Sequence, residues 1–179
     1  MAFKFGKNVD EMCYPFMYES SSLCDFEVIT DELCGHIGAI ISHLPEDMPD
    51  IAADLEQIQP LAFHINGSIR GRLAVSEEDQ AWLQQRLNHY KAEVPERLNG
   101  FVLPRGTPPI PQLHLARSAC KKAIRVMVKV DQEGIDVPML LPRMCNMLCN
   151  LFFVLTLVIN QRRGLVEPGF ISRSYGKDV

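Results

Sequence analysis

Four basic side chains stand at helical spacing in one segment, and together they could hold a polyanion. These side chains are His114, Arg117, Lys121 and Arg125. Residues three and four positions apart share a helix face, so the four would form one basic stripe. Few acidic residues stand four positions from them, so the stripe is poorly suited to neutralise its own charge. The pattern therefore favours binding of a polyphosphate.

The same stripe has a simpler interpretation, a charged helix face in contact with water. An apolar set recurs at helical spacing on the other side and predicts a core-facing stripe: Ala116, Cys120, Ala123, Met127 and Val130. Gly106 and a proline-rich turn precede the helix, and free amide groups at a helix start can bind an anion. On these residues alone, both interpretations stay open.

A second polar pattern interrupts the most apolar segment, MCNMLCNLFFVLTLVIN. Arg143, Asn146 and Asn150 fall at i, i+3 and i+7 and would form a narrow seam along a helix. A buried asparagine costs free energy unless its amide is hydrogen-bonded. The seam predicts either a hydrogen bond between helices or a ligand contact, at the end of a bundle or between subunits.

The cysteines, at positions 13, 24, 34, 120, 145 and 149, contain no CxxC pair. Cys145 and Cys149 are one helical turn apart and could share a metal, but we predict buried core thiols and no protein-bound metal. The N-terminal MAFKFGKNVDEM has no continuous apolar stretch, so we expect no signal peptide. Reduced thiols and a cytoplasmic location are therefore predicted.

Five helices are predicted to position these residues within a single domain spanning 1–179. Thr30 and Ser76 are candidate caps for the first and third helices, which begin with acidic residues. An irregularity is expected at Pro142. The expected helices span about 31–44, 49–69, 77–91, 108–133 and 136–163, with a loop over 1–29, a loop around 99–109 and a tail over 164–179.

Composition narrows the class of protein. The chain has 179 residues, 47% of them hydrophobic, and a formal charge of −4, so it can bury a core without disulfides. That charge argues against a general nucleic-acid or membrane-surface binder but leaves a local anion site open. The uninterrupted apolar run 151–159 is far shorter than the about 20 residues that span a bilayer, and we predict a buried helix.

Several segments resemble the ATP:cob(I)alamin adenosyltransferases of the propanediol-utilisation (PduO) type. FVLPRGT followed by LHLARSACKKAIR is similar to that family's FVLPGG followed by LHxARxxCRRAER. MCNMLCNLFFVL is similar to its xLNRLSDLLFVL, and VITDELCGHIGA to its GTxDELNSxIG. Near the N-terminus, FKFGK resembles an altered form of its TKTGD phosphate loop. The resemblance covers most of the chain.

This resemblance implies an all-α fold, a five-helix antiparallel up-and-down bundle, in agreement with the helix pattern. It implies a homotrimer with active sites between subunits, which transfers the 5′-deoxyadenosyl group of ATP to cobalamin cobalt and releases triphosphate. Cobalamin, ATP and Mg²⁺ are the implied ligands, because cations must stabilise the departing triphosphate. A corrinoid reductase or a B12-dependent enzyme is the implied protein partner.

The resemblance also implies roles for individual residues. Phe101 matches an aromatic residue that displaces the lower axial ligand of cobalt. Arg117 matches an arginine that pairs across the subunit interface with an aspartate, here Asp31, and Asn146 matches the asparagine of LNRLSD. The residues assigned to phosphate, from this resemblance and from the basic stripe, are Lys4, Gly6, Lys7, His114, Lys121, Lys122 and Arg125.

Departures from the family pattern fall mostly on the nucleotide side. Ile124 stands in place of the glutamate of AER, and Lys7 in place of the aspartate of the phosphate loop. The other departures are Phe3 and Phe5 for threonines, Met147 for arginine, Asn150 for aspartate and Arg105 for glycine. Three hypotheses follow: a divergent adenosyltransferase, a non-catalytic corrinoid-binding or carrier protein with a degraded ATP site, and an interaction bundle without a ligand.

Overall fold

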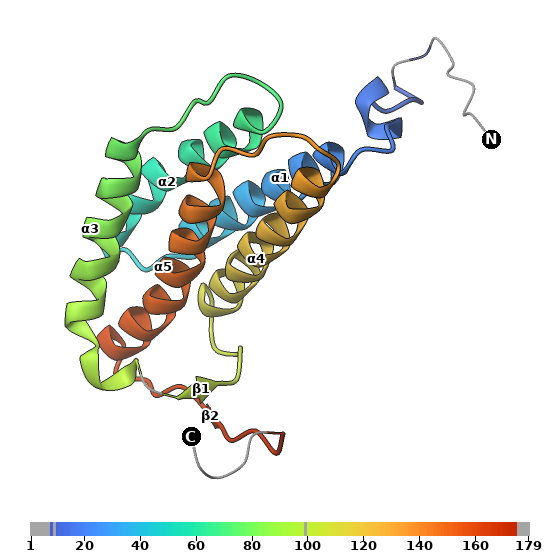
Figure 1. The fold of residues 1–179 in the computed structure, drawn as a ribbon. Coiled ribbons are helices and arrows are strands. Elements are labelled where there is room, and N and C mark those ends of the chain that lie inside the picture. The colour runs from blue at the N-terminus through green and yellow to red at the C-terminus, as the bar shows by residue number, and fades with distance from the viewer. Residues whose placement is uncertain (1–7, 9, 99, 175–179) are drawn as a thin grey trace.

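The computed structural model describes residues 8, 10–98 and 100–174, and its main elements are helices (Figure 1). Two short 3-10 helices and one pair of two-residue strands accompany them. The elements are η1 (Pro15–Tyr18), α1 (Ser22–Ser42), α2 (Pro49–Ser68), α3 (Glu77–Glu93), η2 (Pro95–Arg97), β1 (Phe101–Val102), α4 (Ile110–Gln132), α5 (Leu140–Arg162) and β2 (Gly169–Phe170). The prediction of an all-α fold with five helices is confirmed.

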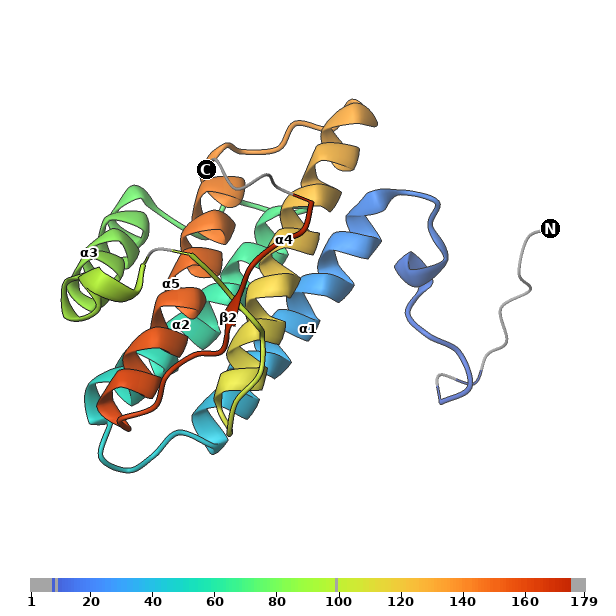
Figure 2. The same cartoon turned by 90° about the horizontal axis from the view of Figure 1, so that it is seen from below.

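The helices form a bundle in which α1 packs against α2 and α4, α4 against α5, and α5 against α3 (Figures 1 and 2). Short connections make α1 and α2, and α4 and α5, antiparallel. Helices α3 and α5, which are two apart in the chain, run in the same direction, as an up-and-down bundle requires. Arg143 contacts Glu77 where both helices begin, and Arg162 contacts Glu93 where both end.

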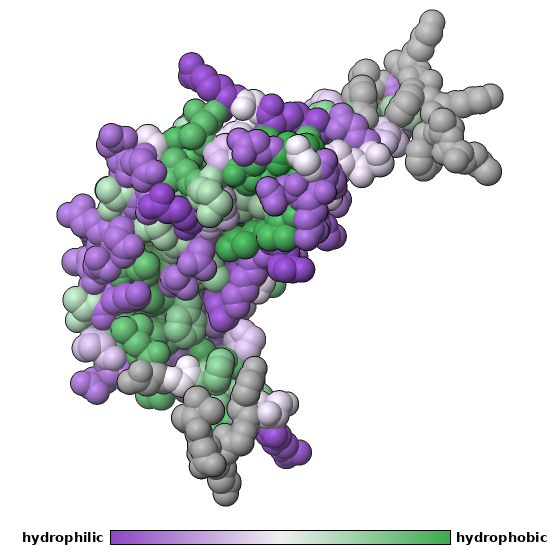
Figure 3. All heavy atoms as spheres, in the orientation of Figure 1, coloured by the Kyte–Doolittle hydropathy of each residue, from purple (hydrophilic) through white to green (hydrophobic). Residues whose placement is uncertain are grey.

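The core is continuous along the bundle and is densest on α5. That helix buries apolar residues on nearly all sides from Leu151 to Ile159. By length and composition α5 could cross a membrane, but 72% of its most apolar window is buried inside the bundle, so it is the core helix predicted from sequence. On α3 only Leu83, Leu87 and Tyr90 are buried, and the side of the molecule that α3 forms is mostly hydrophilic (left in Figure 3).

The first helix begins earlier than predicted, so the expected loop over 1–29 is wrong for its last residues. Helix α1 starts at Ser22, and the Ser21 hydroxyl accepts a hydrogen bond from the Leu23 amide as its cap. Thr30, the predicted cap, is buried inside the helix and donates to the Phe26 carbonyl at 2.8 Å. Serine caps helices as well as threonine does, and burial of Phe26 favours the longer helix.

The last helix begins later than predicted and carries no irregularity at Pro142. Helix α5 starts at Leu140, so Pro142 lies in the first turn, where a missing amide hydrogen removes no helical bond. Gly164 follows the helix with a φ of 66°, in the left-handed region that glycine adopts readily. Ser76 caps α3 through a reciprocal bond with Asp79, as its sequence position predicted.

The segment after α5 is more ordered than the predicted tail. Strand β2 pairs antiparallel with β1, with Phe170 opposite Phe101 and Gly169 opposite Val102. The segment of β1, predicted as a loop, therefore includes a short strand. The pair lies beyond the end of the bundle where α4 begins and α5 ends (Figure 1). This arrangement connects the C-terminal segment to Phe101, for which the family resemblance implies a role at cobalt.

A buried ion pair joins α2 to α3. Asp54 accepts hydrogen bonds from the Arg86 guanidinium and the Tyr90 hydroxyl, both at 2.6 Å. Burial, with the Asp54 hydrogen bond as the next cause, raises the pKa of Tyr90, so this phenol stays protonated and donates to Asp54. Asp54, Arg86 and Tyr90 are hydrogen-bonded to one another, so removal of one side chain leaves the others without a partner.

Replacing Asp54 with alanine is expected to lower the free energy of unfolding by about 2–4 kcal/mol, because Arg86 then stays partly buried without a counter-charge. Urea unfolding followed by circular dichroism measures this change. Glu56→Ala, an exposed position on the same helix, is the control and should change stability by under about 0.5 kcal/mol. Equal stability of the two variants would contradict a stabilising role for the network.

Candidate functional site

Arg117 lies where α4 packs against α5, and residues of α5 in the same chain hold it. We call this surface, with Arg117 and Lys121, the basic face. The Arg117 guanidinium sits over the Phe153 ring, 5.2 Å from the ring centroid, and the arginine side chain hydrogen-bonds the Cys149 thiol. Stacking on an aromatic face suits the planar, weakly hydrated guanidinium. Both contacts come from α5, so the arginine has a defined position before any ligand binds.

The two asparagines of the polar seam lie on α5 on either side of Cys149, whereas Arg143 contacts Glu77 on α3. Asn146 and Asn150 are exposed. The positive charges of Lys121 and Arg117 act on the pKa of Cys149, which lies between the two asparagines in sequence. Within the part of the chain that the structure describes, neither asparagine forms the helix–helix hydrogen bond that sequence allowed. Because their amides face outward, the remaining alternative, a contact with a ligand or a neighbouring subunit, is the one that the structure leaves open.

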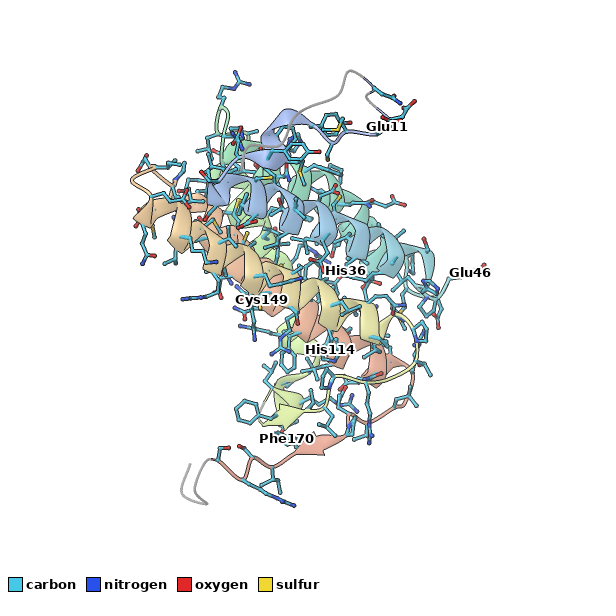
Figure 4. The ribbon with its side chains drawn as sticks, turned by 90° about the vertical axis from the view of Figure 1, so that its right-hand side faces the viewer. Glu11, His36, Glu46, His114, Cys149 and Phe170 are labelled. Carbon is cyan, nitrogen blue, oxygen red and sulfur yellow. The ribbon has the colours of Figure 1, made fainter. Side chains whose placement is uncertain are left out.

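His114 does not share the exposed face of the basic stripe. It is 7% exposed, and its Nδ1 has no hydrogen-bond partner among the described residues. Burial, with a smaller contribution from the positive charge of Arg117, lowers the pKa of the imidazole. His114 is therefore neutral near pH 7, and the cationic stripe consists of Arg117, Lys121 and Arg125. In Figure 4, His114 lies between Cys149 and Phe170 along the molecule.

The buried imidazole makes stability depend on pH. An unfolded chain protonates His114 as the pH falls through about 6.5, whereas the folded chain resists protonation until lower pH. The stability that the neutral ring contributes is present above about pH 6.5 and is lost as the pH falls towards the folded pKa. We expect His114→Gln to show a smaller loss of unfolding free energy between about pH 7.5 and 5.5 than the wild type. His64→Gln, an exposed histidine, is the control, and an unchanged pH dependence in His114→Gln would contradict the assignment.

Helix α1 presents acidic residues to α4. Lys122 Nζ lies 2.6 Å from Glu32 Oε2, and Glu32 Oε1 lies 3.4 Å from His36 Nε2. The hydrogen bond from Lys122 is the main cause that holds the pKa of Glu32 below its ordinary value. Lys122 therefore already has a carboxylate partner in this chain. Asp31, next to Glu32, is exposed, and among the described residues no ion pair joins it to Arg117.

The start of α4 offers fewer free amides than the sequence suggested. The Ile110 amide donates to the Thr107 carbonyl, the Leu113 amide donates to the Pro109 carbonyl, and Pro111 has no amide hydrogen. Gly106 has a φ of 155°, and a side chain there would collide with Ile110. The turn is thus built for close packing, and it does not favour the anion site predicted at this helix start.

Phe101 lies at the end of the molecule that carries the strand pair. Its side chain is 66% exposed, and Phe170 on β2 is its direct cross-strand neighbour. Exposed apolar surface of this kind is typical of contacts with an apolar ligand or another chain. The structure therefore separates an aromatic end, with Phe101, from the basic face, with Arg117 and Lys121.

The remaining predicted site residues divide into two groups. Arg125 is exposed on α4, two turns beyond Arg117. Lys4, Gly6 and Lys7, predicted to contact phosphate, lie outside the described residues. The site residues that the structure brings together are therefore Arg117 and Lys121 on α4 with the polar seam of α5.

The buried cysteines agree with the predicted core thiols. All six are unpaired, and Cys13 alone is exposed. Burial raises the pKa of Cys145 to about 12 and raises the pKa of Cys120 well above its ordinary value, so both are neutral thiols near pH 7. Burial also raises the pKa of Cys149, although Lys121 and Arg117 oppose this shift. Cys149 therefore serves Arg117 as a neutral thiol.

One group of potential metal ligands lies elsewhere, where α2 begins and α3 ends. Asp50, His89 and Glu93 place ligand atoms within 4.8 Å of one another. The Arg162 guanidinium bridges the two carboxylates, at 2.7 Å from Asp50 and 2.8 Å from Glu93. An arginine already supplies the positive charge there, so these residues form a structural ion-pair cluster.

Sequence reasoning missed several residues that build the site. Phe153 and Cys149 were interpreted only as core, although both stand at helical spacing from Asn146 and so share its face. Glu32 was interpreted only as an acidic residue near a helix start. Glu167, in the predicted tail, gave no signal in the sequence. Contacts between segments distant in sequence decide each of these cases.

Comparison with known proteins gives the family. The sequence profile described as "Cobalamin adenosyltransferase" matches residues 23–159, which include α4 and most of α5. The chain is 36% identical over 138 residues to a cobalamin adenosyltransferase of Cupriavidus metallidurans, covering 75% of this chain and 72% of that protein. It is 33% identical over 143 residues to a corrinoid adenosyltransferase of Bacillus subtilis, with the same coverage.

Solved structures agree at the level of the fold. A single-residue variant of the PduO-type ATP:corrinoid adenosyltransferase from Lactobacillus reuteri, complexed with cobalamin and ATP, superposes with a TM-score of 0.73 at 22% identity, over 87% of this chain and 89% of that one. Another variant of that enzyme, complexed with ATP, gives 0.72 at 23% identity, over 86% and 90%. With a profile match over most of its length and two relatives above 30% identity, the chain belongs to the cobalamin adenosyltransferase family.

Proposed function

We propose that this protein is a corrinoid adenosyltransferase that moves the 5′-deoxyadenosyl group of ATP to cob(I)alamin. The electron pair of Co(I) attacks C5′ of ATP, a cobalt–carbon bond forms, and the bond between C5′ and the triphosphate oxygen breaks. Triphosphate leaves with the electron pair of the broken C5′–O bond. The observation that carries the proposal is the family match over residues 23–159, which include Arg117 and Lys121.

The basic face is suited to the leaving group, triphosphate. Arg117 is fixed by Phe153 and Cys149, and Lys121 acts on the same thiol, so two cations lie side by side. Fixed positive charge stabilises an anion that develops during a reaction at little cost of reorganisation. We assign Arg117 and Lys121 to the triphosphate. Arg125, further along α4, and Asn146, on α5, are assigned to the same ligand site.

The exposed aromatic end is suited to the corrinoid. Reduction of cobalt to Co(I) is difficult while a lower axial ligand is bound, and a bulky apolar group in place of that ligand favours the reduced state. We assign this role to Phe101, which β1 presents to the exterior of the chain. Cobalamin would then bind at Phe101, and the triphosphate of ATP at Arg117 and Lys121.

Mg²⁺ is proposed as part of the nucleotide substrate. Phosphate oxygens and water are the ligands that Mg²⁺ prefers when it enters with a nucleotide. The acid nearest to the α4 lysines, Glu32, is bonded to Lys122, so a Mg²⁺ site made of protein carboxylates does not fit this face. When bound, the ion offsets part of the phosphate charge.

The assembly proposed is a homotrimer with sites between subunits. Exposed Asp31 of one subunit would pair with Arg117 of its neighbour, which explains why the two residues do not pair within one chain. A corrinoid reductase or a B12-dependent enzyme is the proposed protein partner, and the cytoplasm is the proposed location, because the described thiols are unpaired.

A second function is favoured by one contact. Lys122, assigned to phosphate, is bonded to Glu32 at 2.6 Å, and its neighbour Ile124 stands where the family has a glutamate. Both features weaken the nucleotide side and leave the corrinoid side intact. The alternative is a corrinoid-binding or carrier protein on the same bundle that does not use ATP.

Separate titrations decide between the two functions. Cobalamin and MgATP are each titrated into the protein, with the corrinoid absorption spectrum and calorimetry as the two measurements. The adenosyltransferase proposal requires binding of both ligands. Binding of cobalamin without MgATP would support the carrier, and binding of neither would remove both functions.

A further inference from the structure

We infer that Glu167 is a positioning residue for the corrinoid site, because it fixes the C-terminal strand that holds Phe101. The inference rests on the proposed function, in which Phe101 displaces the lower axial ligand of cobalt. Glu167 lies in the segment after α5, outside the residues matched by the family profile. Its contacts connect the core of the bundle to the strand pair.

Glu167 is held by two donors that converge on one oxygen. Asn160 Nδ2 donates to Glu167 Oε1 at 3.1 Å, and Arg97 Nη1 donates to the same atom at 3.4 Å. The Glu167 side chain is only 10% exposed, and Asn160 is 4% exposed. A carboxylate this well covered stays in place because its charge and hydrogen bonds are satisfied there.

Arg97 ties the same segment to α5 through backbone carbonyls. Its Nη2 donates to the Leu165 carbonyl at 2.9 Å, and its Nη1 reaches the Leu157 carbonyl at 3.4 Å. The Leu165 amide in turn donates to the Asn160 carbonyl at 2.7 Å. The chain leaving α5 is therefore fixed at both Leu165 and Glu167 before β2 begins.

The fixed segment leads directly to Phe101. Pro168, next to Glu167, accepts a hydrogen bond from the Leu103 amide at 2.8 Å. Gly169 and Phe170 then pair with β1, and Phe170 lies opposite Phe101. Figure 4 shows Phe170 on the strand pair, beyond the end of the bundle. The path from the core to Phe101 thus runs through Asn160, Glu167 and β2.

The strand pair needs this support because it is very short. A pair of two-residue strands is not stable alone in water. The β1 backbone carries Phe101, so a shift of the strand pair shifts this side chain. Loss of the Glu167 carboxylate would leave the Arg97 charge and the buried Asn160 amide without their shared acceptor, so this segment would move or loosen.

The lower axial ligand supplies a specific test. Cobinamide is a corrinoid without the nucleotide base that binds the lower face of cobalt, so it needs no displacement by Phe101. Misplacing Phe101 should therefore slow the reaction of cobalamin and spare that of cobinamide. A general loss of folding or of ATP binding would slow both reactions equally.

The experiment compares wild type, Glu167→Ala, Phe101→Ala and the double variant with each corrinoid, supplied in the Co(II) form together with a reductant. We expect Glu167→Ala to lower kcat with cobalamin by at least about tenfold and with cobinamide by under about threefold. The double variant should be no slower with cobalamin than Phe101→Ala, because both changes remove one function. Glu167→Gln, which keeps an oxygen for Asn160, should recover part of the loss. Glu96→Ala, an exposed acid on η2, is the matched control and should be unchanged.

A second measurement does not require ATP. The absorption spectrum of bound cob(II)alamin gives the fraction without its lower ligand, and this fraction should fall in both Glu167→Ala and Glu167→Gln, further in the alanine variant. If wild type binds cob(II)alamin in that form but transfers no adenosyl group, the proposed function fails and the spectra still test Glu167. Equal losses with both corrinoids, or unchanged spectra, would overturn the inference.

Discussion

Replacing Arg117 with alanine is expected to lower the rate of adenosyl transfer by about 10²- to 10³-fold, the usual loss when a fixed group that stabilises a developing anion is removed. The arginine is held over Phe153 and bonded to Cys149, so its charge is already aimed when triphosphate departs. The variant should also weaken the proposed trimer, because Asp31 of the neighbouring subunit loses its partner. Steady-state kinetics and sedimentation velocity measure the two effects.

Two further variants make this result specific. Arg117→Lys keeps the charge but loses the planar fork, so it should recover assembly better than activity. Arg72→Ala removes an exposed arginine in the connection between α2 and α3 and should change neither measurement. If Arg117→Ala leaves both turnover and assembly unchanged, Arg117 has no role in the site.

Replacing Lys121 with glutamate is expected to weaken MgATP or triphosphate binding by more than about tenfold. Reversing a charge about 7 Å from a phosphate changes the interaction by several kcal/mol at an effective dielectric near 20, and solvent screening of this exposed side chain reduces that figure. Cobalamin binding should change much less, because its contacts are assigned to Phe101. Calorimetric titration of each ligand measures both constants.

Lys129→Glu is the matched control, since Lys129 is exposed on the same helix two turns beyond Lys121. It alters the net charge of the protein by the same amount, so it reports any effect of overall charge. Equal weakening of MgATP binding by the two variants would mean that the basic face acts only through the net charge. No weakening by Lys121→Glu would return the stripe to the solvated surface that the sequence allowed.

The helices were the most predictable part of the fold, because local patterns specify them. Ser76 with Asp79 forms the cap that the sequence indicates, and Gly164 ends α5 as expected. The start of α1 was missed because its first turns mix polar and apolar residues, and Phe26 becomes a core residue only when α1 meets its neighbours. Tertiary packing, which local propensity does not contain, sets that boundary.

The candidate site was predicted in part. The cations Arg117 and Lys121 were found from spacing, and the contact of Arg117 with Phe153 follows from the packing of α4 on α5. The burial of His114 could not be derived, because a histidine three residues before an arginine fits either a charged face or the edge of the core. The support of Phe101 by Glu167 depends on the pairing of Phe101 with Phe170, 69 positions later in the sequence, which forms only in the folded chain.

The measurement that tests the central claim most directly is the reaction itself. The protein is mixed with ATP and chemically reduced cob(I)alamin in the absence of oxygen, and the products are separated and quantified. The proposed function predicts adenosylcobalamin and triphosphate in equal amounts, with Lys121→Glu requiring more ATP. Phe101→Ala should react slowly only when the reaction starts from cob(II)alamin, because the role assigned to Phe101 precedes the formation of Co(I). Tight binding of cobalamin with no adenosylcobalamin formed at saturating ATP would contradict the account and leave the corrinoid carrier in its place.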